Sequence, residues 1–311
     1  MKQSKTREQL IQMYIESLKQ DIIPWRQRWI GNECMNGISH LKYKGVNQLL
    51  LSYISSKEKY NDSRWYTYIQ VKQSGYKLNK QAKGKGVPVE FWSCYNIKTK
   101  QRVDFDDYQK IIELNPEEKN NYRVICNTSY VFNAKYVDGL EPMKEAKKID
   151  NIEISNYISK VIKKLGVKYS EEGNRAYYNP TTDEIVLPNK DKFVDNYSYY
   201  ATQLHELCHS TGNQKRLNRN MSNNNKEDYA REELIAEISS SFLMQKLNVD
   251  VNAEHYDNHK AYIQSWIRIL EDKPSELFKA INESNKVCKY IDNNSKIKTK
   301  EKVRWLIWEI T

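Results

Sequence analysis

The chain lacks a long hydrophobic run, which excludes the class of proteins that cross a membrane on apolar helices. It also lacks the hydrophobic core of a secretory signal, because the polar, basic residues 1–9 lead directly into an amphipathic pattern. Hydrophobic residues still make up 39% of the 311 residues, with seven Trp and 23 Tyr, which is typical of folded protein. We therefore expect a folded protein that stays in the cytoplasm and has no membrane partner.

Paired cysteines are also missing. The five cysteines are odd in number and widely spaced, and they form no Cys-x-x-Cys pair: Cys34, Cys94, Cys126, Cys208 and Cys288. This pattern argues against a disulfide framework and agrees with reduced thiols in a cytoplasm. A Walker loop is absent too, because the Gly-rich turn 84–86 has neither the spacing nor the Ser/Thr of that motif.

The excess of positive over negative charge is confined to the N-terminal part of the chain. Residues 1–100 contain 18 Lys and Arg against 7 Asp and Glu, whereas residues 101–311 contain 32 against 33. A domain-sized positive field attracts polyanions, so nucleic acid is the leading partner for this half. Solubility and an anionic membrane surface are the alternatives that charge alone leaves open.

Aromatic residues are interleaved with the basic ones in the same half, as in Trp65, Tyr66 and Tyr68 between Arg64 and Lys72. Single-stranded nucleic acid is bound by this mixture of base stacking and phosphate neutralisation, with little sequence preference. Other aromatic residues of this group, Trp25 and Trp29, are followed or flanked by arginines. The candidate DNA contacts are Arg64, Trp65, Lys72, Lys80, Lys83 and Lys85.

The expected fold class is α+β, in two domains, because single cores rarely grow beyond about 250 to 300 residues. Domain boundaries are placed at 1–143 and 151–293, separated by a Lys/Glu-rich linker, with a tail of unclear structure at 294–311. In the first domain the patterns predict helices over 5–20, 47–53 and 67–72, and strands over 87–92 and 130–134.

The second domain is predicted to begin with a helix over 152–165 that Gly166 ends. A hairpin follows, formed by residues 175–180 and 184–188. The remaining predicted helices contain the motifs discussed next or close the domain, over 259–270 and 274–290.

The most informative segment of the chain is His205-Glu206-Leu207-Cys208-His209. On a helix, residues four apart lie one above the other, so His205 and His209 can present two imidazoles to one zinc ion. Glu206 then lies beside the open position of the metal. There it can act as general base toward a zinc-bound water, whose pKa the metal lowers to about 7, and then as general acid.

A catalytic zinc site needs a third protein ligand. The helical segment 229–237 offers Glu233 and Glu237, one turn apart, so that one carboxylate can ligate while the other supports. Its Glu-x-x-Ala sequence resembles the third-ligand helix of Glu-type zincins, which assigns Glu233 as ligand and Glu237 as the hydrogen-bond partner of a histidine ring. Glu232 is expected to point to solvent.

Two alternatives concern other potential ligands. Cys208 could complete a closed, structural Cys/His/His/Glu site, but free cysteine on the inner face of a helix is more often a small buried hydrophobe. His255 and His259 repeat the four-residue spacing without the adjacent Glu, and a solvated or capping pair is favoured over the alternative of a second metal site.

Taken together, these segments resemble the ArdC-type antirestriction proteins of plasmids and other mobile elements, over nearly the whole chain. The resemblance rests on Ile23-Pro24-Trp25, Tyr43-Lys44-Gly45-Val46-Asn47, Val131-Phe132-Asn133-Ala134 with Gly139-Leu140, Tyr199-Tyr200-Ala201-Thr202 before the zinc motif, Arg216-Leu217-Asn218-Arg219, and residues 229–237. The chain departs from the family at Cys208 and in the Trp-rich tail after Lys302.

The resemblance implies an N-terminal domain that binds single-stranded DNA and a C-terminal zincin domain akin to SprT-like and IrrE-like peptidases. It implies Zn²⁺ held by His205, His209 and Glu233, with Glu206 as catalytic carboxylate, in a protein that guards incoming DNA from restriction during conjugation. We expect a zinc peptidase whose protein substrate the sequence does not identify. The alternatives are a passive DNA-coating shield with a silent zinc domain, or a peptidase that cleaves a transcriptional repressor.

Overall fold

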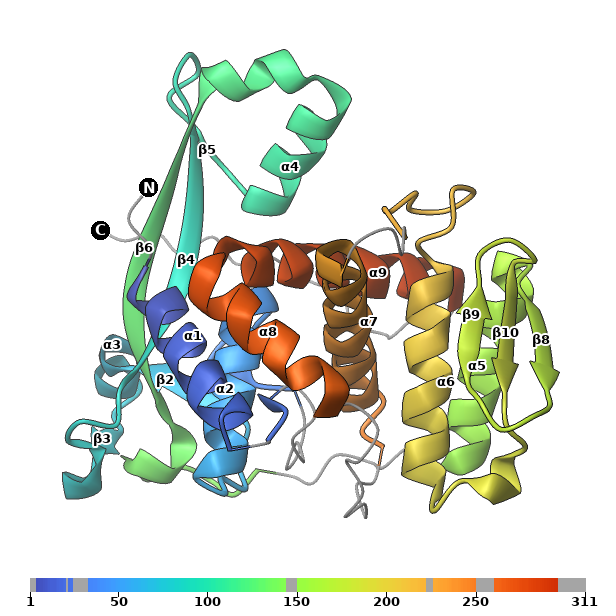
Figure 1. The fold of residues 1–311 in the computed structure, drawn as a ribbon. Helices are drawn as coiled ribbons and strands as arrows, with labels where there is room; N and C mark the ends of the chain where they lie inside the picture. The colour runs from blue at the N-terminus through green and yellow to red at the C-terminus, as the bar shows by residue number, and fades with distance from the viewer. Residues whose placement is uncertain are drawn as a thin grey trace.

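The computed structural model describes residues 4–20, 22–24, 33–143, 150–221, 226–249 and 260–295 (Figure 1). Several predictions lie outside these ranges, namely those on Trp25, Trp29, His255, His259 and the tail from residue 296. None of the described helices is both long and apolar enough to span a bilayer. The fold is α+β, as expected, with a sheet at each end of the molecule and helices between them.

The N-terminal half is built on a five-stranded sheet with the order β1-β2-β6-β4-β5. Strand β1 pairs in parallel with β2, and the other neighbours are antiparallel. The strands are β1 Met35–Asn36, β2 Arg64–Thr67, β4 Val87–Asn96, β5 Arg102–Val103 and β6 Tyr122–Asn133. A separate two-stranded pair is formed by β3 Lys77–Leu78 and β7 Val137–Asp138.

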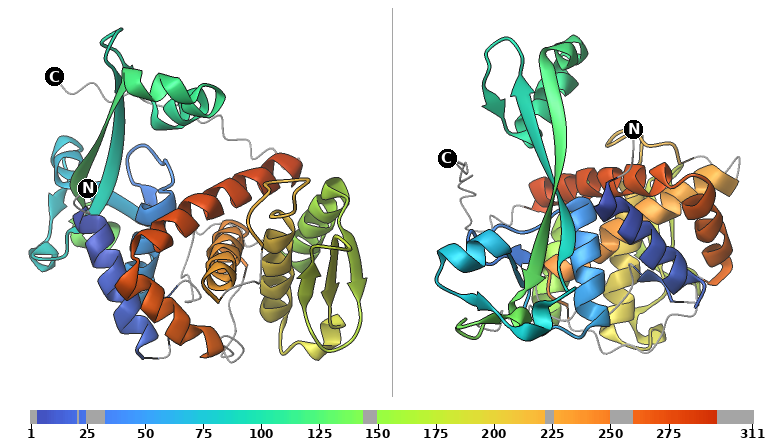
Figure 2. Two further views of the ribbon diagram at one scale, coloured as in Figure 1. Left: turned by 45° about the horizontal axis from the view of Figure 1, so that its top comes forward. Right: turned by 90° about the vertical axis from the view of Figure 1, so that its left-hand side faces the viewer.

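Strands β4 and β6 are the longest and pair over ten positions, from Val87↔Val131 to Asn96↔Tyr122. Their far ends extend beyond the body of the molecule as a twisted ribbon, hereafter the arm, which includes β5 and α4 Phe105–Leu114 (Figures 1 and 2). The sequence pattern predicted only the ends of this ribbon nearest the core, because the outer half of β6 alternates without a buried hydrophobic face.

Three further helices belong to the N-terminal half: α1 Lys5–Leu18, α2 Gly45–Lys57 and α3 Tyr68–Gln73. Ser4 caps α1 and Thr67 forms a capping box with Gln70 at the start of α3, which satisfies amide groups that a helix leaves unpaired. Helix α1 packs on α2 and α8, and its side chains Leu10, Tyr14 and Leu18 are fully buried. All three predicted helices of this half are confirmed.

The C-terminal half has a three-stranded sheet of order β8-β10-β9, formed by β8 Lys168–Glu171, β9 Tyr177–Asn179 and β10 Glu184–Leu187. The predicted hairpin is confirmed as the antiparallel pair β9–β10, and the parallel partner β8 was not predicted. Helix α5 Asn151–Leu165 precedes the sheet and ends at Gly166, whose left-handed backbone (φ 67°) suits glycine.

The remaining helices are α6 Asn196–Ser210, α7 Lys226–Lys246, α8 Lys260–Asp272 and α9 Ser275–Ser295. Helix α7 lies in the middle of the molecule and packs on α6 and α9, while α9 also contacts α2 and α5 (Figure 1). One hydrophobic core therefore runs from α1 and α2 to the three-stranded sheet. A buried hydrogen bond of 2.9 Å from Gln245 of α7 to Ser52 of α2 also joins the two halves.

Candidate metal centre

Helix α6 positions the two histidines. Its N-cap Asp195 accepts a 2.7 Å hydrogen bond from the Ser198 amide, and the apolar face with Leu204 and Leu207 is fully buried in the core. His205 and His209 project one turn apart toward α7, with 7% and 9% of their surface exposed. Their rings meet edge to face, with centroids 4.6 Å apart.

Helix α7 brings Glu233 to the same point. The Nε2 atoms of His205 and His209 lie 3.0 Å apart, and the Glu233 carboxylate oxygens lie 3.7 and 3.4 Å from them. One ligand atom from each of the three residues falls within 4.8 Å of the others. Two imidazoles and one carboxylate form a donor set that a catalytic zinc ion takes, with a fourth position left open.

The charge around this point also fits a divalent cation. Glu206, Glu232, Glu233 and Glu237 are all at least nine-tenths buried, and of these four carboxylates Glu232 is the one that forms an ion pair with Arg219. Burying unbalanced carboxylates is costly, because the protein interior solvates charge poorly. The residues present therefore fit Zn²⁺, the ion that the zincin fold implies.

Each histidine has a carboxylate beside its Nδ1 atom, the ring nitrogen that does not face the donor set. The Nδ1 atom of His205 lies 3.5 Å from Glu237, the residue predicted for this role, and Nδ1 of His209 lies 3.1 Å from Glu232. The prediction that Glu232 points to solvent is therefore wrong. Glu232 is 7% exposed and lies on the inner side of α7 because Arg219 and His209 both bind it.

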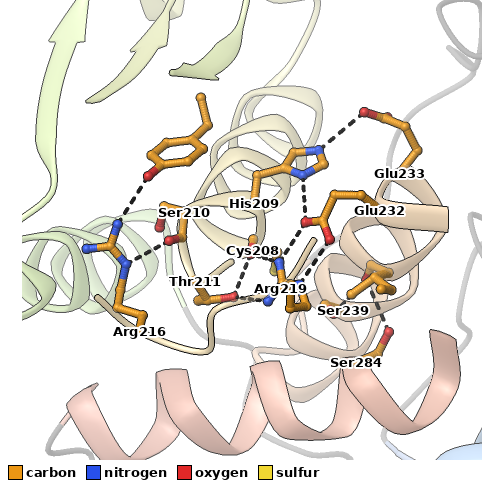
Figure 3. A network of polar contacts seen from close by, with 12 residues as sticks. Cys208, His209, Ser210, Thr211, Arg216, Arg219, Glu232, Glu233, Ser239 and Ser284 are labelled. Carbon is orange, nitrogen blue, oxygen red and sulfur yellow. Dashed lines mark hydrogen bonds and ion pairs between the residues drawn. The ribbon is translucent and has the colours of Figure 1, made fainter. Parts of the chain in front are cut away.

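Arg219 connects the end of α6 to α7 (Figure 3). Its guanidinium donates to both Glu232 oxygens at 2.7 and 3.0 Å, to the Cys208 carbonyl at 2.9 Å and to the Thr211 hydroxyl at 2.7 Å. A bidentate arginine fixes a carboxylate in orientation as well as charge. Arg219 therefore holds Glu232 where it orients the His209 ring, and the only sequence signal for it was the Arg216–Arg219 motif.

The pKa values follow from burial and from these contacts. Burial raises the pKa of Glu206 to about 7, and the neighbouring Glu233 adds to the rise. Burial alone would lower the pKa of His209, but its hydrogen bonds to Glu232 and Glu233 outweigh burial and raise it. Perturbed values of this kind cluster at functional sites.

Cys208 does not join the donor set. Its side chain is fully buried in the core, and burial raises its thiol pKa well above the usual range, which disfavours the thiolate that binds metal. The structure thus supports the interpretation of Cys208 as a packed hydrophobe and argues against a closed, four-residue structural site.

We expect Glu232→Ala to lower zinc affinity about 10- to 100-fold, because the His209 ring loses the carboxylate that fixes its tautomer and orientation. Competition with a chromophoric chelator measures the affinity. Glu172→Ala, at an exposed position of the same half, is the matched control and should bind zinc as the wild type does. Equal affinity of the two variants would show that Glu232 has no part in the site.

A second buried network fixes the loop after α6. Arg216 donates to the Ser210 carbonyl at 2.7 Å and pairs with Asp183, which also accepts a 2.8 Å hydrogen bond from Tyr178. Asn213 in turn donates to the Tyr178 hydroxyl at 2.9 Å. The C-terminal end of the histidine helix is thereby tied to strand β9.

This network predicts a pH-dependent stability. Burial would raise the pKa of Asp183, but Arg216 and Tyr178 outweigh burial and hold it below its ordinary value. Its contribution is therefore complete above the unfolded pKa of about 3.9 and is lost as the pH falls through the folded value. We expect Asp183→Asn to lower the free energy of unfolding by roughly 3 kcal/mol at neutral pH. In urea titrations the difference from wild type should shrink below about pH 4, and a difference independent of pH would contradict this account.

The residues predicted to contact DNA differ in exposure: one is buried, one is held by internal partners, and four are exposed. The interpretation of Trp65 is wrong, because its ring is fully buried in the core and packs edge-on against Tyr60, with centroids 5.9 Å apart. Arg64 is held by the Asp62 carboxylate at 2.6 Å and by the Glu141 carbonyl at 2.8 Å. The remaining four candidates have exposed side chains: Lys72, Lys80, Lys83 and Lys85. Of these, Lys85 forms an ion pair with Glu58 at 3.4 Å.

Both halves of the chain match known families. Residues 4–132 match the N-terminal domain of anti-restriction factor ArdC, and residues 156–283 match a zincin-like metallopeptidase domain. The crystal structure of the metal-free antirestriction ArdC protein from plasmid R388 has a TM-score of 0.71 at 27% identity, covering 94% of this chain and 98% of that chain. The Mn(II)-bound structure of the same protein has a TM-score of 0.69 at 28% identity, with the same coverage.

The curated relatives share about a third of their residues with the chain over the aligned region, but some of them are much longer. The uncharacterized protein y4eC of Sinorhizobium fredii is 31% identical over 263 residues, which cover 83% of this chain and 80% of that protein. Two proteins of Escherichia coli named DNA primase TraC are 32% and 31% identical over 290 and 297 residues. The chain spans only 19% and 27% of their length.

Proposed function

Because the chain belongs to the ArdC family of antirestriction proteins, we propose that it is a zinc peptidase that binds single-stranded DNA and cleaves proteins on or near that DNA. The observation that carries the proposal is the convergence of His205, His209 and Glu233 with the buried carboxyl of Glu206 alongside them. A bound zinc ion would polarise the scissile carbonyl and lower the pKa of water at the site to about 7.

Glu206 supplies the proton transfers. Its carboxyl lies near His209 and Glu233, where it would accept a proton from the attacking water and deliver it to the leaving amine. A general base works best when its pKa is close to the working pH, and burial moves Glu206 in that direction. His205 and His209 are oriented by Glu237 and Glu232, so neither is available as the base.

A route for the substrate is offered by strand β9. It is one of the two outer strands of its sheet in the described part of the chain, and the Tyr178 backbone lies beside the Glu206 carboxyl. An extended peptide can add to such an edge through main-chain hydrogen bonds. The scissile bond would then lie beside Glu206, and side chains of the peptide would contribute less to selection than its extended conformation.

Binding to single-stranded DNA is supported by the basic N-terminal half. The charge excess of residues 1–100 and the exposed lysines of α3 and the following turn favour a polyanion. Two relatives are named DNA primase, a name that refers to action on DNA. Residence on one strand would raise the local concentration of a protein substrate bound to that strand.

The test is a cleavage assay with zinc-loaded protein and a general single-strand-binding protein as candidate substrate, with and without oligo(dT). We expect cleavage to depend on both the oligonucleotide and Glu206. Cleavage that is indifferent to DNA would favour action on a free protein such as a repressor. DNA binding without any cleavage would instead favour a passive coating role and reject the peptidase.

A further inference from the structure

One face of the arm carries an aromatic ring between two arginines. Tyr95 of β4 lies directly opposite Arg102 of β5 on one side and Arg123 of β6 on the other. Residues directly opposite each other in antiparallel strands project from the same face of the sheet. All three side chains are exposed, Tyr95 with 36% of its surface. The ring is therefore flanked by two cationic groups on an open surface.

The same face continues toward the body of the molecule. Because side chains alternate along a strand, Phe91 lies on the face of Tyr95, four residues or roughly 13 Å away. Phe91 is 45% exposed and lies opposite Asn127, and Ile125, 39% exposed, occupies the row between the two aromatic rings. None of the paired positions of this face holds a carboxylate.

The opposite face of the arm is closed. Trp92 packs on Phe105 of α4 with centroids 5.6 Å apart, and Tyr108 of α4 packs on Tyr122 at 5.3 Å. Cys94, on the same face, is fully buried and lies near Tyr108 of α4. Helix α4 lies on this side of the ribbon (Figure 1), and the arm stands clear of the body in the side view (Figure 2, right). Helix α4 therefore covers the opposite face of the arm and leaves the face with Tyr95 and Phe91 open.

The cations of the open face are not neutralised by any described carboxylate. In the part of the chain that the structure describes, neither Arg102 nor Arg123 has an ion pair, whereas Arg7 at the base of the arm is bound by Glu90 at 2.8 Å. Lys98 and Lys100, in the turn before β5, are exposed as well. An unpaired cationic rim around exposed rings is complementary to an anionic chain with planar groups, and single-stranded nucleic acid combines these two features.

We propose that this open face, formed by Phe91, Tyr95, Ile125, Arg102 and Arg123, is the platform on which single-stranded DNA is held. The inference rests on the proposed function and names the surface that performs it. Unpaired bases stack on Tyr95 and Phe91, and the two arginines neutralise the adjacent phosphates. Duplex DNA binds more weakly, because its bases are already stacked on one another.

The experiment measures the dissociation constant for oligo(dT) by fluorescence anisotropy at several salt concentrations. We expect Tyr95→Ala to raise the constant at least about fivefold, the lower end of what one stacked base contributes, and Tyr95→Phe to stay close to wild type. Each of Arg102→Glu and Arg123→Glu should also flatten the dependence of log K on log salt by at least about 0.7.

Two matched controls lie outside the open face. Tyr177→Ala removes a tyrosine of β9 that is 45% exposed, and Lys164→Glu reverses an exposed charge on α5. Both should bind as the wild type does, and circular dichroism should show all variants folded. Wild-type protein that does not bind oligo(dT) would overturn the proposed DNA function itself. Wild-type binding that Tyr95→Ala and the two arginine reversals leave unchanged would overturn only the platform, and would favour a protein partner for this face.

Discussion

Glu206→Gln is expected to lower the rate of peptide hydrolysis at least about 100-fold, because general acid–base catalysis contributes about 10²- to 10⁴-fold. Glutamine keeps the shape of the side chain but neither accepts the proton of the attacking water nor returns it to the leaving amine. The change should leave the donor set of His205, His209 and Glu233 in place. Initial rates at saturating substrate, together with zinc content, measure both expectations.

The matched control for this prediction is Glu172→Gln, which makes the same chemical change at an exposed carboxylate. It should retain the full rate. A Glu206→Gln protein that retains zinc and wild-type activity on a substrate cleaved by the wild type would remove Glu206 from the mechanism. Loss of activity together with loss of zinc would instead show that Glu206 acts through the metal site.

His209→Asn is expected to abolish tight zinc binding and, with it, the stabilisation that zinc gives the fold. An ion that binds only the folded state adds about 2.7 kcal/mol to the free energy of unfolding when its free concentration is 100 times its dissociation constant. The variant also removes the His209 ring from beside the carboxylates of Glu232 and Glu233. Thermal unfolding with and without zinc should therefore show a large shift for wild type and almost none for the variant.

The control is His40→Asn, at an exposed histidine in the loop between β1 and α2. This variant should unfold at a zinc-dependent temperature like that of the wild type. If His209→Asn were stabilised by zinc as strongly as His40→Asn, the ion would bind elsewhere in the chain, and the assignment of His209 would be wrong.

The elements with a strong local signal were predictable from the sequence. Helix α5 has a capping box at its start and Gly166 at its end, and the histidine spacing on α6 fixes the direction of two side chains without knowledge of the tertiary fold. The pairing of Glu233 with them required the resemblance to other zincins, because Glu233 and Glu237 are equivalent by spacing alone.

What the sequence did not predict depends on contacts between distant segments. Glu232 looks like a solvated residue until Arg219, thirteen residues earlier, is placed beside it. Trp65 looks like a stacking residue in a basic segment, but it lies on β2, an inner strand of the sheet, and its side chain is buried in the core. The sequence around Tyr95 does not identify it as a binding residue, because the two arginines beside it come from other strands.

The central claim is that two imidazoles of α6 and one carboxylate of α7 hold a single zinc ion. An anomalous difference map at the zinc edge, from crystals of the wild-type protein grown with zinc, tests it most directly. We predict one strong peak about 2.0 to 2.2 Å from Nε2 of His205, Nε2 of His209 and a carboxylate oxygen of Glu233. A map with no peak at this point, or with its strongest peak on other residues, would contradict the account.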